Sequence, residues 1–148
     1  MGRRSRQDKY PDTEYFHYYN ANPRNKITTD CVLRALATGL NEDYNTVAKE
    51  LFELSLKTGY SMEDKHLYNK YLESKGWHKL KQPVKRDGTK YTGIEWCDEL
   101  NNDGEHHNII CHIGSHHIVA IVFDNSYGYR VYDIWNSSNG KIGTYWMK

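Results

Sequence analysis

The hydrophobic pattern changes along the chain, and this change limits the folds that the chain can adopt. Between residues 29 and 100, apolar side chains recur every three or four residues, which is the period of a helix with one buried face. From residue 108 onward they gather in short β-branched runs separated by turn residues, as in strands. Helices followed by an antiparallel sheet predict an α+β fold in which the helices pack on the sheet.

Capping residues and glycines mark the boundaries of these elements. The patterns predict helices over residues 30–39, 45–57, 61–75 and 92–100, and strands within 77–91 and over 108–113, 117–123, 129–135 and 143–147. Capping-box patterns begin at Ser61 and Thr92. Residues 1–24 are polar and rich in tyrosine, so we expect an extended arm there, followed by a single domain over residues 25–148.

Charge and cysteine content restrict the environment and the partners. The 148 residues include 20 basic and 19 acidic side chains, so the chain has no overall field that attracts nucleic acid or acidic membranes. We expect the basic stretch over residues 2–9 to be a solvated tail, and binding to nucleic acid is the weaker alternative. No apolar run approaches the ~20 residues that span a bilayer, and three cysteines without framework spacing argue against disulfides. We therefore expect a cytoplasmic protein with reduced thiols and no membrane partner.

A cysteine and a histidine lie where the predicted elements would make them reactive. Cys31 falls in the first turn of a predicted helix, where unpaired N–H groups and the helix dipole favour a thiolate. His117 opens a predicted strand of a hairpin. If the hairpin loop centres on Ser126, residues whose numbers sum to about 252 face each other, and Asp133 lies diagonally beside His117 on the same face. Asp133 is thus placed to orient the histidine, whereas Asn136 takes that role only if the strand ends or bulges before it.

These residues and their order resemble the papain-like cysteine peptidase superfamily, in a compact form of the kind that phage genomes encode. The resemblance rests on Asp30-Cys31-Val32-Leu33-Arg34-Ala35, His117-Ile118-Val119-Ala120 and Tyr132-Asp133-Ile134-Trp135. It implies a papain-like fold over residues 25–148 and a catalytic triad of Cys31, His117 and Asp133. It also implies that Asn25, six residues before the cysteine, helps to form the oxyanion hole. A phage protein of this kind would act in the cytoplasm of the host cell.

Other residues surround this site or suggest a different chemistry. Trp135 and Asn136 directly follow the candidate triad and are candidates for binding substrate. Zinc binding is the alternative suggested by a short stretch that contains Cys97, His106, His107, Cys111, His112, His116 and His117. Their spacing matches no structural zinc site, and Cys111 and His112 alternate across one predicted strand. We therefore expect neither a metal nor a cofactor.

The sequence thus predicts an enzyme that uses a thiol nucleophile. We expect a cysteine-dependent acyl hydrolase or transferase, peptidase-like or isopeptidase-like, that acts on a protein or peptide substrate such as a host protein. The alternative is a catalytically inactive papain-like binding module, such as a phage inhibitor of a host protein. Replacing Cys31 with alanine separates the two hypotheses, because only the enzyme needs the thiol.

Overall fold

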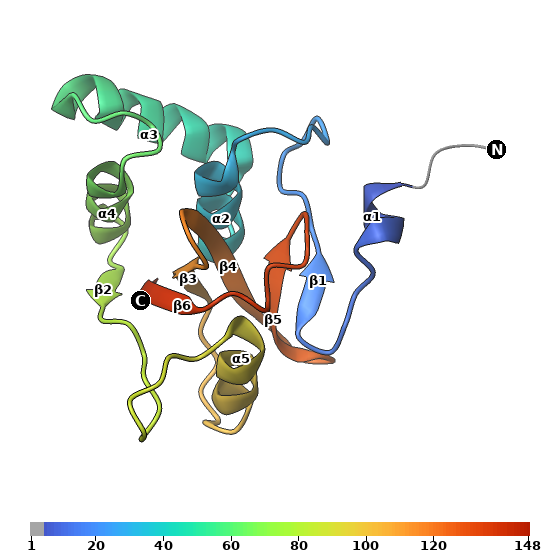
Figure 1. The fold of residues 1–148 in the computed structure, drawn as a ribbon. Helices are drawn as coiled ribbons and strands as arrows, with labels where there is room; N and C mark the ends of the chain where they lie inside the picture. Colours follow the sequence, from blue (N-terminus) through green and yellow to red (C-terminus); the bar gives the residue numbers. More distant parts are fainter. Residues whose placement is uncertain (1–4) are drawn as a thin grey trace.

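One six-stranded sheet organises the chain, which a computed structural model describes over residues 5–148. The strands are β1 Phe16–Tyr18, β2 His78–Leu80, β3 Ile109–Ile113, β4 His117–Asp124, β5 Gly128–Asp133 and β6 Ile142–Met147, and the helices are α1 Arg6–Lys9, α2 Cys31–Leu40, α3 Tyr44–Thr58, α4 Lys65–Ser74 and α5 Gly93–Asn101. The strand order is β1-β5-β4-β3-β6-β2 (Figure 1). Neighbouring strands are antiparallel except β1 and β5, which are parallel. The predicted α+β class is confirmed, but the sheet is mixed rather than antiparallel, because the N-terminal segment contributes β1.

Helices cover both faces of the sheet, because its central strands are apolar on both sides (Figure 1). On one face, Ile110 of β3 packs in a core cluster with residues of α2, α3 and α4. On the other face, Ile109 and Cys111 of the same strand pack with Trp96 and Cys97 of α5. This alternation follows from the two-residue period of a strand, and it explains why the strands are continuous apolar runs in the sequence. Within residues 5–148, no helix is long and apolar enough to cross a membrane.

The capping signals in the sequence locate one of the two marked helix starts correctly. Thr92 and Glu95 form the predicted capping box at α5, each side chain accepting a hydrogen bond from the backbone N–H of the other. The capping box expected at Ser61 does not form. Helix α4 is capped instead by Asp64, whose carboxylate accepts from the His66 N–H at 2.8 Å. Both residues are good caps, and the residues between them form a turn.

The N-terminal segment packs against the rest of the domain. Strand β1 pairs with β5 so that Phe16 faces Val131 and Tyr18 faces Asp133, and Phe16 is fully buried. Arg6–Lys9 form the short helix α1, which contains no buried residue, so this part of the basic stretch is helical while it faces solvent as expected; residues 2–4 of the stretch lie outside the described residues. The pairing places this segment beside Asp133, the residue expected to orient the histidine.

Gly39 allows close contact between α2 and the sheet. A Cβ at this position would overlap Cγ1 and Cδ1 of Ile110, which is fully buried. Overpacking of a core costs about 1–3 kcal/mol, whereas glycine-to-alanine replacement in a helix gains at most about 1 kcal/mol. We therefore expect Gly39→Ala to lower the free energy of unfolding by about 1–2 kcal/mol in urea denaturation. Thr38→Ala, a neighbouring change outside the fully buried core, serves as the control, and an equal effect of the two variants would contradict the overlap.

Candidate active site

The candidate nucleophile is the first residue of α2. Cys31 is partly buried there, and α2 packs against β4, the strand that His117 opens. The N–H groups of Cys31, Val32 and Leu33 have no hydrogen-bond partner within residues 5–148, as is usual in the first turn of a helix. Burial raises the pKa of the Cys31 thiol, but its interaction with His117 and the positive charge of Arg34 outweigh burial and lower the pKa below its ordinary value. This position therefore favours the thiolate.

His117 lies between the thiol and a buried carboxylate. Its Nε2 is 2.7 Å from Oδ2 of Asp133, which leaves Nδ1 as the ring nitrogen available to Cys31. Burial disfavours the charged imidazole, but the hydrogen bond to Asp133 and the interaction with Cys31 raise the pKa of His117 to about 9. Burial also opposes ionisation of Asp133, but the hydrogen bond and charge of His117 hold its pKa below the ordinary value. These directions favour an imidazolium between a thiolate and a carboxylate.

The hairpin register that brings His117 and Asp133 together is the one predicted. Ala120 faces Tyr132, as expected for a loop centred on Ser126. Strand β5 ends at Asp133, and the carboxylate lies diagonally across from His117 on the same face of the hairpin. The sequence left two candidates for the residue that orients the histidine, and the structure places Asp133 in that position.

Of the other predicted site residues, one lies beside His117 and two lie outside the pocket. Trp135 is 39% exposed, and its ring centroid lies 5.1 Å from that of His117. Asn136 does not line the pocket at the triad, and its side chain accepts hydrogen bonds from Ser138 within its own turn. Asn25 is exposed, has a left-handed backbone with φ 54°, and accepts a hydrogen bond from the Asn20 side chain at 3.4 Å. The structure thus brings the tryptophan to the site but leaves Asn25, the expected oxyanion donor, outside the pocket.

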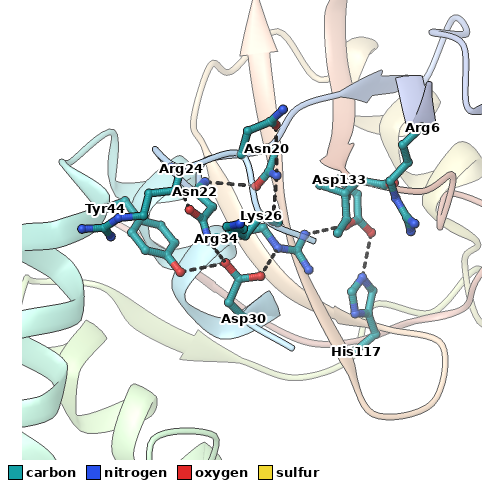
Figure 2. A network of polar contacts seen from close by, with 12 residues as sticks. Arg6, Asn20, Asn22, Arg24, Lys26, Asp30, Arg34, Tyr44, His117 and Asp133 are labelled. Atoms are coloured by element: carbon teal, nitrogen blue, oxygen red, sulfur yellow. Dashed lines mark hydrogen bonds and ion pairs between the residues drawn. The ribbon is translucent and has the colours of Figure 1, made fainter. Parts of the chain in front are cut away.

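A buried ion-pair network supports the candidate triad (Figure 2). Arg34 is only 7% exposed; its Nε donates to Asp30 Oδ1 at 2.8 Å and its Nη1 donates to Asp133 Oδ1 at 2.9 Å. The second carboxylate oxygen of Asp30 accepts from Asn22 at 3.1 Å and from Tyr44 at 2.7 Å. Sequence reasoning missed this network. The i, i+4 spacing of Asp30 and Arg34 was the one signal of it, since the link to Asp133 joins residues 99 positions apart.

Asp133 is fixed by donors on both of its oxygens. Besides Arg34, the backbone N–H of Ile134 donates to Oδ1 at 2.8 Å. Besides His117, the hydroxyl of Ser137 donates to Oδ2 at 2.6 Å. The residue is 1% exposed, and a carboxylate buried this deeply requires such partners to remain charged.

The candidate triad opens into a pocket of about 1130 Å³. Its walls come from α1, the segment before α2, the start of α4, the β3–β4 turn and the segment after β5. On one wall the Tyr68 hydroxyl lies 2.6 Å from His112 Nε2. Burial and the nearby Cys31 raise the pKa of Tyr68 to about 12, and burial lowers the pKa of His112, so this pair is neutral at physiological pH. Sequence reasoning did not assign this polar wall beside the thiol.

The cysteines and histidines considered as zinc ligands lie in different parts of the fold. Cys97 and Cys111 are buried among apolar residues on the α5 side of the sheet, where burial raises the pKa of both thiols. The ring of His106 stacks on Phe123. Among the described residues, no group of three or more His, Cys, Asp or Glu side chains is arranged to hold a metal ion.

No protein-family model, curated protein or solved structure matches the chain. The geometry of the pocket therefore carries the functional argument.

Proposed function

We propose that the chain is a cysteine-dependent acyl hydrolase or transferase, peptidase-like or isopeptidase-like, whose catalytic residues are Cys31, His117 and Asp133. The observation that carries the proposal is a helix-start thiol and an imidazole that line one pocket, with a buried carboxylate hydrogen-bonded to the imidazole. The carboxylate orients the imidazole and stabilises its protonated form, and the protonated imidazole stabilises the thiolate.

The proposed reaction proceeds through a thioester. The Cys31 thiolate attacks the carbonyl carbon of the substrate and forms an Sγ–C bond. The bond from that carbon to the leaving nitrogen then breaks as His117 donates a proton to the nitrogen. Water or another nucleophile adds to the thioester and gives its proton to His117, and the Sγ–C bond breaks to return the thiolate. Peptide and isopeptide bonds both fit this sequence of steps.

The oxyanion that forms during attack needs donors, and we assign this role to the start of α2. The unpartnered N–H of Cys31 is adjacent to the attacking sulfur, and the helix dipole adds a favourable field there. This assignment replaces Asn25, which faces Asn20 outside the pocket.

The reactivity of Cys31 tests the proposal directly. We expect iodoacetamide to alkylate Cys31 in the folded protein well below pH 8.5, the approximate pKa of a free thiol, as measured by intact mass. His117→Ala should return the reaction to the ordinary thiol profile, because it removes the group that most favours the thiolate. Cys97 and Cys111 are fully buried and act as internal controls that should remain unmodified. An inert Cys31, or equal profiles for the two proteins, would support the binding module instead.

We also infer that the arrangement is papain-like. In support, the nucleophile begins a helix that packs on the sheet, and the histidine and carboxylate come from neighbouring antiparallel strands of that sheet. A protein or peptide is the substrate class that we propose, because the pocket is large and partly open and Trp135 presents an exposed ring beside the histidine.

A further inference from the structure

Arg6 of α1 lies at the wall of the same pocket with part of its guanidinium unused. Its Nε donates to the carbonyl of Ile134 at 2.6 Å, which fixes the side chain against the segment after β5. The group also lies over the ring of Tyr10, at 5.3 Å from the ring centroid. Within residues 5–148, no carboxylate forms an ion pair with Arg6, and its two Nη groups have no hydrogen-bond partner. A positioned but unpaired guanidinium is suited to binding a carboxylate, because two parallel N–H groups match its two oxygens.

Arg6 lies on the side of the pocket where the leaving part of the substrate would bind. Ile134 lies between Asp133, which holds His117, and Trp135, whose ring is beside His117. Figure 2 shows Arg6 reaching toward Asp133 from α1. In the proposed reaction His117 gives its proton to the leaving nitrogen, so the leaving part of the substrate occupies the His117 side of the pocket. Arg6 therefore faces the leaving part rather than the acyl part.

Most of the charged side chains near α4 differ in sign from Arg6, so the two ends of the pocket differ in charge. Glu63 and Asp64, which directly precede α4, and Lys65, its first residue, also line the pocket. Two of these three side chains are acidic, so that end of the pocket does not favour an anion. Arg34 also reaches the pocket, but its charge is taken up by Asp30 and Asp133. Among the arginine and lysine side chains of residues 5–148 that line the pocket, Arg6 is thus the one left available to a substrate anion on the His117 side.

We propose that Arg6 binds a carboxylate carried by the leaving part of the substrate, so that acyl transfer from acidic leaving groups is preferred. The inference rests on the proposed function of the triad, since that function defines which part of the substrate leaves. The carboxylate is either the end of a peptide or an acidic side chain just after the cleaved bond. Arg6 is a specificity residue in this scheme and takes no part in proton transfer.

A pair of disulfide reagents tests the charge preference without a known substrate. Dithiobis(nitrobenzoate) carries carboxylates on both halves, and dithiodipyridine is a neutral aromatic disulfide of comparable size. Both exchange with a thiolate, so the ratio of their rate constants at Cys31 reports the preference for an anion and cancels changes in thiol reactivity. We expect Arg6→Gln to lower this ratio by about fivefold at low ionic strength, and Arg6→Glu to lower it further.

The control is Lys9→Gln, which removes the same charge from the same helix at an exposed position that does not line the pocket. This variant should leave the ratio within about twofold of the unmodified protein, because the interaction of an exposed charge outside the pocket is weakened by distance and by the high dielectric constant of water. An Arg6→Gln ratio equal to that of Lys9→Gln would overturn the inference. A failure of the proposed function would appear elsewhere, as an ordinary pH profile for Cys31, since the ratio can be measured even on an ordinary thiol.

Protection experiments distinguish the two sources of the carboxylate. N-acetylalanylalanine offers a terminal carboxylate, and the amide of N-acetylalanylglutamate offers only an acidic side chain. Whichever protects Cys31 better from dithiodipyridine identifies the source, and Arg6→Gln should abolish its advantage over neutral N-acetylalanylalaninamide. Equal protection by all three compounds would overturn the inference.

Discussion

Replacing Arg34 with methionine is expected to lower the free energy of unfolding by about 3–5 kcal/mol. The change leaves Asp30 and Asp133 buried without the cation that joins them, at 8% and 1% exposure respectively. Among the described residues, Asp30 then has no cationic partner and Asp133 keeps only His117, and the loss of a cation from buried carboxylates costs more than the packing that a methionine side chain restores. Urea denaturation followed by tryptophan fluorescence measures the loss.

Two further variants test whether the effect comes from the buried position and from the shape of the arginine side chain. Arg24→Met removes an arginine at an exposed position and should change the free energy of unfolding by less than about 0.5 kcal/mol. Arg34→Lys keeps the charge but cannot reach both carboxylates with the planar fork of arginine, so its loss should be intermediate. A loss below about 1 kcal/mol for Arg34→Met would show that the network contributes little to stability.

Asp133→Asn is expected to slow alkylation of Cys31 at pH 6 by about tenfold or more. Asp133 is the largest favourable contributor to the raised pKa of His117, which lies at about 9 despite burial. Without that carboxylate, burial of His117 lowers the pKa of the imidazole below its ordinary value of about 6.5, and the thiol loses its cationic partner. The thiolate fraction then falls steeply, and the higher nucleophilicity of a less acidic thiol offsets only part of the fall.

The pH profile and a neighbouring variant complete the Asp133 experiment. A raised pKa means that the imidazolium is present at low pH and is lost as pH rises through about 9, and in Asp133→Asn this limit should move down. Ser137→Ala removes another donor to the same carboxylate oxygen but leaves His117 bound to it. It should keep the reactivity of Cys31 close to that of the unmodified protein. A pH 6 rate in Asp133→Asn equal to that in Ser137→Ala would contradict the role assigned to the carboxylate.

Local patterns in the sequence predicted the parts of the site that lie on one hairpin and one helix start. The turn around Ser126 fixes the register of β4 and β5, and this register decides that Asp133 meets His117. The pairing of β1 with β5 was not predicted, because the pattern of a three-residue strand does not specify its partner. The burial of Arg34 was not predicted for a related reason: burial of an arginine depends on a partner that is distant in sequence.

The position of Asn25 shows the limit of reasoning from spacing alone. Six positions before the cysteine is a meaningful distance only if the chain between them follows one particular path. Here Asn20 binds the carbonyl of Lys26 at 3.0 Å and the side chain of Asn25, so the loop closes on itself outside the pocket. Spacing predicts geometry within a helix or a hairpin, where the backbone period is known, and not across an irregular loop.

The four donors on Asp133 have a consequence for the energetics of the proposed reaction. In water, a carboxylate beside a forming imidazolium is solvated by dipoles that must reorient as charge moves. Here Arg34, His117, Ser137 and the Ile134 N–H already point at the two oxygens before any substrate arrives. These dipoles are therefore oriented once, when the buried network assembles during folding, and they do not need to reorient in each turnover.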